Sequence, residues 1–161
     1  MSRLVMSMMT PTSRTIVVSS GGCLTEKLVV RDIYMQEEKF DGTTQYARNK
    51  RQQLCMIEEL AKRYPNNGKF FTMHPGWVDT QAIREAMPDF YQKMKDKLRE
   101  PDEGADTILY LSVAELEQLK NGEFYFDREV ADKHLTIALT SYKQKEADAL
   151  MEKLEKLSKL D

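Results

Sequence analysis

Tyr46 and Lys50 are the residues of this sequence whose types and spacing best suit acid–base chemistry. They stand four residues apart at the start of a predicted helix, so their side chains share one helix face. A phenol is a poor base at neutral pH, but a cation within about 4–6 Å favours its ionised form. Such a pair can therefore donate and accept a proton, although a core tyrosine beside a solvated lysine has the same spacing.

Ser20 and residues 74–80 follow two predicted strands and add polar groups that could hold a ligand. Both lie at the carboxyl end of a strand, where open α/β sheets place their ligands. The Ser20 hydroxyl could hydrogen-bond a substrate carbonyl while a tyrosine delivers the proton, or it could belong to a simple turn. Pro75 and Gly76 shape a loop that a flat ring can approach closely, and the Thr80 hydroxyl could bind an amide or a phosphate.

A strand, a helix and a second strand must position these residues. The β-branched apolar run 15–20 predicts a buried strand of a parallel sheet. Apolar residues at three- and four-residue steps predict a helix over 45–63. A second strand is expected over 69–73, and the βαβ unit formed in this way should have a right-handed crossover.

The remaining patterns extend this unit to one α/β domain over residues 1–161. One or two short helices interrupted at Pro88 are expected over 81–98, followed by a helix over 105–119 and a third strand over 123–126. The charged tail 141–161, with leucines on one stripe, predicts a C-terminal amphipathic helix. The sheet therefore has few strands, and strand 15–20 is expected at its edge.

Composition excludes several classes of function. The chain has 161 residues, a formal charge of -2 and a pI near 5.8, so it lacks the basic field that would hold nucleic acid. Two cysteines and two histidines are too few for a disulfide framework or a His-rich zinc site, and no metal site is predicted. The sequence contains no run of 18 or more apolar residues, the length that a helix needs to span a bilayer. We expect a cytoplasmic protein without a targeting segment.

Other reactive residue types are assigned structural roles. His74 is expected to be a hydrogen-bonded structural histidine and His134 a surface loop residue. Cys55 is expected to be packed inside the helix 45–63. Arg48 and Arg51 are expected to be solvated.

Three linked motifs resemble the short-chain dehydrogenase/reductase family. They are Val18-Ser19-Ser20-Gly21-Gly22, Tyr46-Ala47-Arg48-Asn49-Lys50 and His74-Pro75-Gly76-Trp77-Val78-Asp79-Thr80. The separation of 26 residues between Ser20 and Tyr46 is similar to that of the retinol-dehydrogenase-like branch. The resemblance covers roughly residues 13–160. It implies a partial Rossmann-like, doubly wound parallel sheet, the C-terminal half of the family's fold, with about three strands and helices on both faces.

The resemblance implies an oxidoreductase that interconverts carbonyl and alcohol groups with NAD(P)H. By this resemblance Tyr46 is the general acid/base, Lys50 favours its phenolate and binds the nicotinamide ribose, and Ser20 orients the substrate carbonyl. Cofactor contacts are implied for Tyr46, Lys50, Pro75, Gly76, Trp77, Val78 and Thr80. The resemblance implies a small carbonyl or alcohol substrate, covered by residues 83–98. Phe90 and Tyr91 in that region suggest an apolar ligand such as a lipid-like or aromatic carbonyl.

The glycine-rich turn that receives the pyrophosphate in dinucleotide-binding folds is not in this sequence. None of the seven glycines forms GxxxGxG or GxGxxG. We therefore expect a truncated form, the catalytic half, that binds cofactor poorly or not at all and has weak or no independent activity. The alternative is an inactive fragment that acts only by pairing with another chain. Its bare sheet edge could be filled by a partner, and helix 45–63 could form a homo-oligomer.

Overall fold

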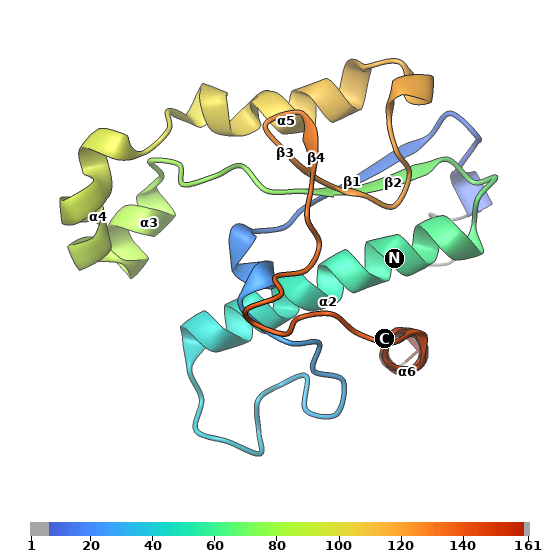
Figure 1. Ribbon diagram of the computed structural model, residues 1–161, viewed down its shortest axis with the longest axis horizontal. Helices are drawn as coiled ribbons and strands as arrows, with labels where there is room; N and C mark the ends of the chain where they lie inside the picture. The colour runs from blue at the N-terminus through green and yellow to red at the C-terminus, as the bar shows by residue number, and fades with distance from the viewer. Residues whose placement is uncertain (1–6, 160–161) are drawn as a thin grey trace.

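The computed structural model describes residues 7–159 as a mostly parallel sheet with helices on both faces (Figure 1). The strands are β1 (Arg14–Val18), β2 (Lys69–Met73), β3 (Phe124–Phe126) and β4 (Glu129–Ala131). β1, β2 and β3 run parallel, and β4 is antiparallel to β3. The order β1-β2-β3-β4 gives β1 a single neighbour among the described strands, as the sequence predicted.

One long helix lies on each face of the sheet, with α5 on one side and α2 on the other (Figure 1). The helices are α2 (Gly42–Arg63), α3 (Gln81–Ala86), α4 (Pro88–Met94), α5 (Pro101–Val113) and α6 (Gln144–Leu157), with the 3-10 turns η1 (Gly21–Leu24), η2 (Lys95–Lys97) and η3 (Leu116–Gln118). α6 packs against α2 on the side away from the sheet (Figure 1). One end of the molecule holds the carboxyl ends of β1 and β2, together with η1 and the first turn of α2 (Figure 1).

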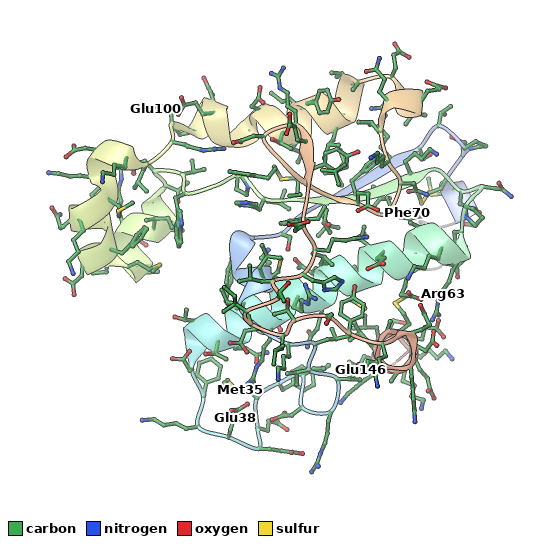
Figure 2. All side chains as sticks on the ribbon, viewed as in Figure 1. Met35, Glu38, Arg63, Phe70, Glu100 and Glu146 are labelled. Carbon is green, nitrogen blue, oxygen red and sulfur yellow. The ribbon has the colours of Figure 1, made fainter. Side chains whose placement is uncertain are left out.

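The alternation of β2 divides the core into two layers. Phe70 packs with Ile57 and Leu60 of α2, and it lies between the sheet and that helix (Figure 2). Phe71 points to the opposite face, where it packs with Leu111 of α5 and meets Tyr125 edge-on at 5.8 Å. Because successive side chains of a strand point to opposite faces, one apolar run holds both covering helices in place.

The structure adds one strand to the prediction and moves two boundaries. Residues 7–159 form four strands where about three were predicted, because Asp127 and Arg128 take φ values of 50° and 65° and turn the chain back into β4. β1 ends at Val18 and not at Ser20. α5 covers 101–113 in place of 105–119, since Pro101 begins the helix and the Glu103 side chain accepts a hydrogen bond from the Glu100 backbone.

Arg51 is completely buried, so the prediction that it is solvated is wrong. Its guanidinium donates to the backbone oxygens of Lys133 and Thr140 and contacts His134 Nδ1, while its Cζ lies 5.0 Å from the centre of the Tyr142 ring. His134, expected on a surface loop, is half-buried for the same reason. These contacts fasten the segment between β4 and α6 to the middle of α2.

No helix in the range 7–159 is both long enough and apolar enough to cross a membrane.

Candidate active site

The Tyr46–Lys50 pair lies in the first turns of α2, next to the end of β1. Lys50 Nζ donates a 2.9 Å hydrogen bond to the Val18 backbone oxygen and lies 5.5 Å from the centre of the Tyr46 ring. Tyr46 is 50% exposed and open to a ligand. An ammonium group has three donors, so Lys50 keeps two for a ligand while it remains fixed to the strand.

Ser20 is placed in a turn beside the same helix. Its Oγ accepts a 3.2 Å hydrogen bond from the Gly22 backbone and caps η1. A Cβ built on Gly22 would lie 3.5 Å from Ser20 Oγ and 3.8 Å from the Cβ of Ala47, which follows Tyr46 in the chain. The structure therefore brings Ser20 near the helix turn that carries the tyrosine, although Ser20 is not the last residue of a strand.

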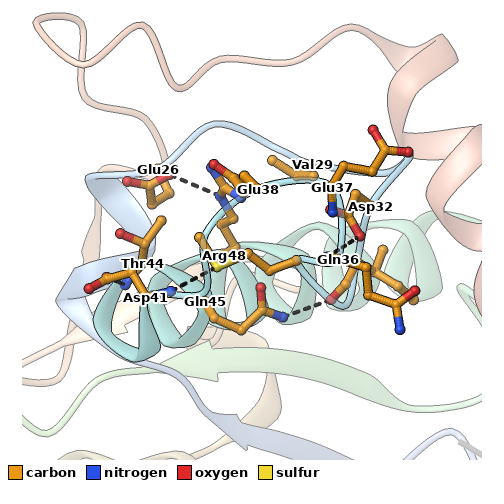
Figure 3. A network of polar contacts seen from close by, with 12 residues as sticks. Glu26, Val29, Asp32, Gln36, Glu37, Glu38, Asp41, Thr44, Gln45 and Arg48 are labelled. Carbon is orange, nitrogen blue, oxygen red and sulfur yellow. Dashed lines mark hydrogen bonds and ion pairs between the residues drawn. The ribbon is translucent and has the colours of Figure 1, made fainter.

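Residues 25–41, which separate Ser20 from the helix, are irregular and held by polar contacts (Figure 3). Arg48 of α2 pairs with Glu26 at 3.3 Å and with Glu38, so the prediction that Arg48 is solvated is wrong. Asp41 caps α2 by accepting a 2.7 Å hydrogen bond from the Thr44 backbone. This anchoring keeps the longer connection beside the candidate site.

The loop after β2 holds the other predicted cofactor contacts. Pro75 accepts a hydrogen bond from Arg99, and Gly76 has a φ of 80°. Trp77 is 51% exposed and packs on Phe90 of α4, with the ring centres 4.5 Å apart.

Val78 and Thr80, the last two predicted cofactor contacts, lie between the loop and α3. Val78 forms a parallel bridge with Arg99 and lies against Gly104, where a Cβ would meet Val78 Cγ2 at 2.5 Å. Thr80 caps α3 by accepting a 3.4 Å hydrogen bond from the Ile83 backbone. The cofactor roles of both residues stay predictions.

Sequence reasoning missed Arg99 and Asp127, which meet at this loop. The Arg99 guanidinium binds both carboxylate oxygens of Asp127, at 2.5 and 2.7 Å. The two residues are 28 positions apart in the chain. No short-range pattern marks either of them, because their contact depends on the turn between β3 and β4.

His74 is a hydrogen-bonded histidine, as expected. Its Nδ1 accepts a 3.1 Å hydrogen bond from the Gly76 backbone, and its ring stacks on Phe126 with a centre distance of 4.1 Å. Burial, reinforced by the nearby Arg99 guanidinium, lowers the pKa of His74. The neutral ring is therefore the form that the fold favours.

We expect acid to weaken this fold partly through His74. Because its folded pKa is lowered, the stability that neutral His74 contributes is complete above the ordinary imidazole value of about 6.5 and is lost as the pH falls from that value through the folded one. Urea unfolding between about pH 7 and pH 5 should show a falling midpoint. His74→Asn, which keeps an acceptor but does not titrate, should make the fall shallower; an unchanged slope would contradict this role.

The two cysteines do not suit nucleophilic chemistry. Burial raises the pKa of Cys23 to about 11 and that of Cys55 to about 12. Both side chains are inaccessible, and Cys55 is packed as predicted. Because the thiolate is the reactive form of cysteine, we assign both residues to the core.

The described residues fit the nicotinamide end of a dinucleotide better than its pyrophosphate. Lys50 keeps donors that could bind a ribose, whereas the space beside Gly76 is taken by Arg99, whose Nε would lie 2.8 Å from a Cβ at that position. By contrast, the helix beside this site starts at the N-cap Asp41, whose carboxylate would repel a phosphate. Holding the pyrophosphate therefore requires groups other than the start of α2.

No protein-family model matches the chain. The chain is 42% identical over 146 residues to a human protein named dehydrogenase/reductase SDR family member 12, and 43% identical over 147 residues to the Bos taurus protein of the same name. These matches cover 90% and 91% of this chain but 46% of each relative. The chain thus spans about half the length of the curated relatives that it matches.

A crystal structure of an uncharacterized protein from Mycobacterium Paratuberculosis resembles the chain with a TM-score of 0.65. The two are 21% identical, and the match covers 92% of this chain and 51% of the other. At that identity the similarity concerns the fold alone, and it supports the predicted partial Rossmann-like α/β class. The resemblance noted in the sequence is confirmed by the curated relatives.

Proposed function

Because this chain belongs to the short-chain dehydrogenase/reductase family, we propose that it supplies the catalytic residues of an NAD(P)-dependent carbonyl–alcohol oxidoreductase. Tyr46 gives its hydroxyl proton to the carbonyl oxygen during reduction and takes it back during oxidation. Ser20 donates a hydrogen bond to the same oxygen and fixes the carbonyl in place. When bound, the nicotinamide supplies the hydride that the carbonyl carbon receives.

The observation that carries this proposal is the position of Lys50. Its ammonium lies 5.5 Å from the Tyr46 ring centre and is held there by the Val18 oxygen. At this distance from the ring centre the ammonium is within cation–π reach of the tyrosine, so the two side chains share one site. The half-exposed tyrosine is accessible for proton exchange with a substrate.

The Ser20 contact is compatible with this role. Its oxygen accepts a hydrogen bond from Gly22 and caps η1. A hydroxyl that accepts one hydrogen bond still has its own proton to donate. We propose that the turn orients this proton toward the carbonyl oxygen.

We propose a small, apolar substrate. Trp77 and Phe90 form an aromatic pair where the loop meets α4, and Tyr91 lies under Arg84, whose Cζ is 5.5 Å from its ring centre. An aromatic wall of this kind favours ligands that bury apolar surface. A flat, apolar carbonyl compound fits it better than a charged one.

We propose that cofactor binding by this chain alone is weak, because the sequence contains no glycine-rich pyrophosphate turn. The alternative function is association with another chain, favoured by the edge strand β1, whose Val18 is 43% exposed. An unpaired edge offers backbone groups to an incoming strand. Association through α2 is also proposed, restricted to the part of that helix that α6 leaves exposed.

A titration with NADPH and then NADH, followed by Trp77 emission, tests the proposed function. Trp77 is the only tryptophan, so saturable quenching reports binding near the loop. Lys50→Met removes a charge-assisted hydrogen bond worth about 1.5–3 kcal/mol, and we expect it to weaken binding about tenfold or more.

Lys62→Met provides the matched control, since Lys62 lies at the other end of α2 and pairs with Glu58 and Glu59. It should leave the titration unchanged. A flat titration of the unaltered chain would contradict cofactor binding. If light scattering then showed a dimer, the alternative function would be supported.

A further inference from the structure

We propose that Arg99 is a positioning residue that holds residues 75–79 in the conformation in which they face a ring-shaped ligand. The importance of this conformation for catalysis rests on the proposed function, whereas the conformation itself is a property of the chain. Arg99 follows η2 and precedes α5, outside the three motifs of the family resemblance. It contacts the loop through both its backbone and its guanidinium.

The backbone of Arg99 pairs with the loop as a short parallel ladder. Its N–H donates a 2.8 Å hydrogen bond to the Trp77 oxygen, and its carbonyl oxygen accepts a 2.9 Å bond from the Asp79 N–H. The bridge between Val78 and Arg99 is parallel. These two bonds fix the backbone of residues 77–79 beyond the end of β2.

The guanidinium closes over the start of the loop. Arg99 Nη1 donates a 3.2 Å hydrogen bond to the Pro75 oxygen, and a Cβ on Gly76 would lie 2.8 Å from Arg99 Nε. A side chain at position 76 would therefore collide with the arginine. A residue other than glycine at position 76 would also be strained by the φ of 80°.

Asp127 fixes the guanidinium itself. It accepts two hydrogen bonds from Arg99, and Arg99 Cζ also lies 4.8 Å from the centre of the Phe126 ring. An isolated pair on a surface contributes little, but a bidentate pair with a third acceptor and an aromatic face is geometrically specific. A lysine has no planar fork and can satisfy only part of this set.

His74 holds the same turn from inside. Its Nδ1 accepts the Gly76 N–H, and its ring stacks on Phe126. A Cβ on Gly21, the residue after Ser20, would lie 3.5 Å from His74 Cε1. The ring therefore lies close both to the turn that contains Ser20 and to the loop that Arg99 holds.

Hydrogen exchange of the backbone amides of Gly76 and Asp79 tests this inference without any cofactor. In Arg99→Met we expect both amides to exchange about tenfold faster, while the amide of Thr72 in β2 keeps its rate. Arg99→Lys should give an intermediate rate, because charge without the fork restores part of the contact. Arg31→Met, which removes an exposed pair with Glu37, should change none of these amides.

Two outcomes would overturn the inference. If Gly76 and Asp79 kept their exchange rates in Arg99→Met, the loop would hold its conformation without the arginine. If Thr72 accelerated equally, Arg99 would stabilise the whole sheet and not the loop.

The NADPH titration separates this inference from the proposed function. We expect Arg99→Met to raise the NADPH concentration that gives half of the maximal Trp77 quenching about tenfold. If the unaltered chain bound no cofactor while its loop amides still depended on Arg99, the positioning role would stand and the proposed function would fail.

Discussion

Tyr46→Phe is expected to lower the rate of carbonyl reduction by about 10²–10⁴-fold, the range typical for the loss of a positioned general acid. The substitution removes one hydroxyl and keeps the ring, so Lys50 retains its aromatic neighbour and its bond to Val18. Cofactor binding should therefore change far less than turnover. Consumption of NADPH at 340 nm with an apolar aldehyde measures the first quantity, and quenching of Trp77 measures the second.

Tyr64→Phe is the matched control for this experiment. Tyr64 is the C-cap residue of the same helix, at the end opposite to Tyr46, and is also partly exposed. Its loss should leave turnover unchanged. Turnover that survived in Tyr46→Phe would contradict the role of the tyrosine, and an unaltered chain without turnover would contradict the activity itself.

Arg51→Met is expected to lower the free energy of unfolding by about 3 kcal/mol or more. The methionine fills much of the space, but it leaves the Lys133 and Thr140 oxygens without their donor. Each buried polar group that is left unpaired lowers the free energy of unfolding by about 1–3 kcal/mol. The loss of the contact with the Tyr142 ring adds to this cost. Urea unfolding followed by circular dichroism gives the difference directly.

Arg63→Met tests whether burial, and not the bare loss of an arginine, causes this effect. Arg63 lies on the same helix (Figure 2) and pairs with Asp148 and Glu155 of α6 at the surface. It also lies 3.5 Å from Glu59, which keeps Lys62 as a partner when Arg63 is replaced. Exposed pairs of this kind contribute about 0–1 kcal/mol. Equal losses in the two variants would contradict the special role of the buried guanidinium.

The β1–α2–β2 unit could be predicted because its signals are local. The apolar run of β1, the three- and four-residue steps of α2 and the turn at Gly68 each depend on neighbours in the chain. The β3–β4 hairpin gave no comparable signal. Asp127 and Arg128 adopt positive φ without being glycine, and their contacts with Arg99 and Asp106 hold them there. Two positive φ values at the centre of a two-residue hairpin are typical of a type I′ turn, which usually has glycine in second place; Arg128 in that place gives no such signal.

The residues of the candidate site also fall into a group that local motifs could predict and a group that they could not. Tyr46, Lys50 and residues 74–80 could be proposed from their motifs, and the helix spacing correctly placed Lys50 near Tyr46. Arg51 could not be foreseen, because arginine is rarely buried and its acceptors belong to a distant segment. Arg99 was missed because its acceptors, Pro75 and Asp127, lie 24 and 28 residues away in the chain. Local patterns identify groups that can do chemistry, whereas the residues that hold them depend on the complete fold.

The buried Arg51 also has a consequence for how the chain is made. Its backbone acceptors lie 82 and 89 residues further along the chain, so a ribosome working at ~5–20 residues per second needs on the order of 4–18 s to reach them. β1, α2 and β2 are complete well before the end of that interval, whereas the guanidinium still lacks these two acceptors and stays in water. The nascent protein therefore keeps this part of α2 open until late in its synthesis, when docking of the segment after β4 completes the core.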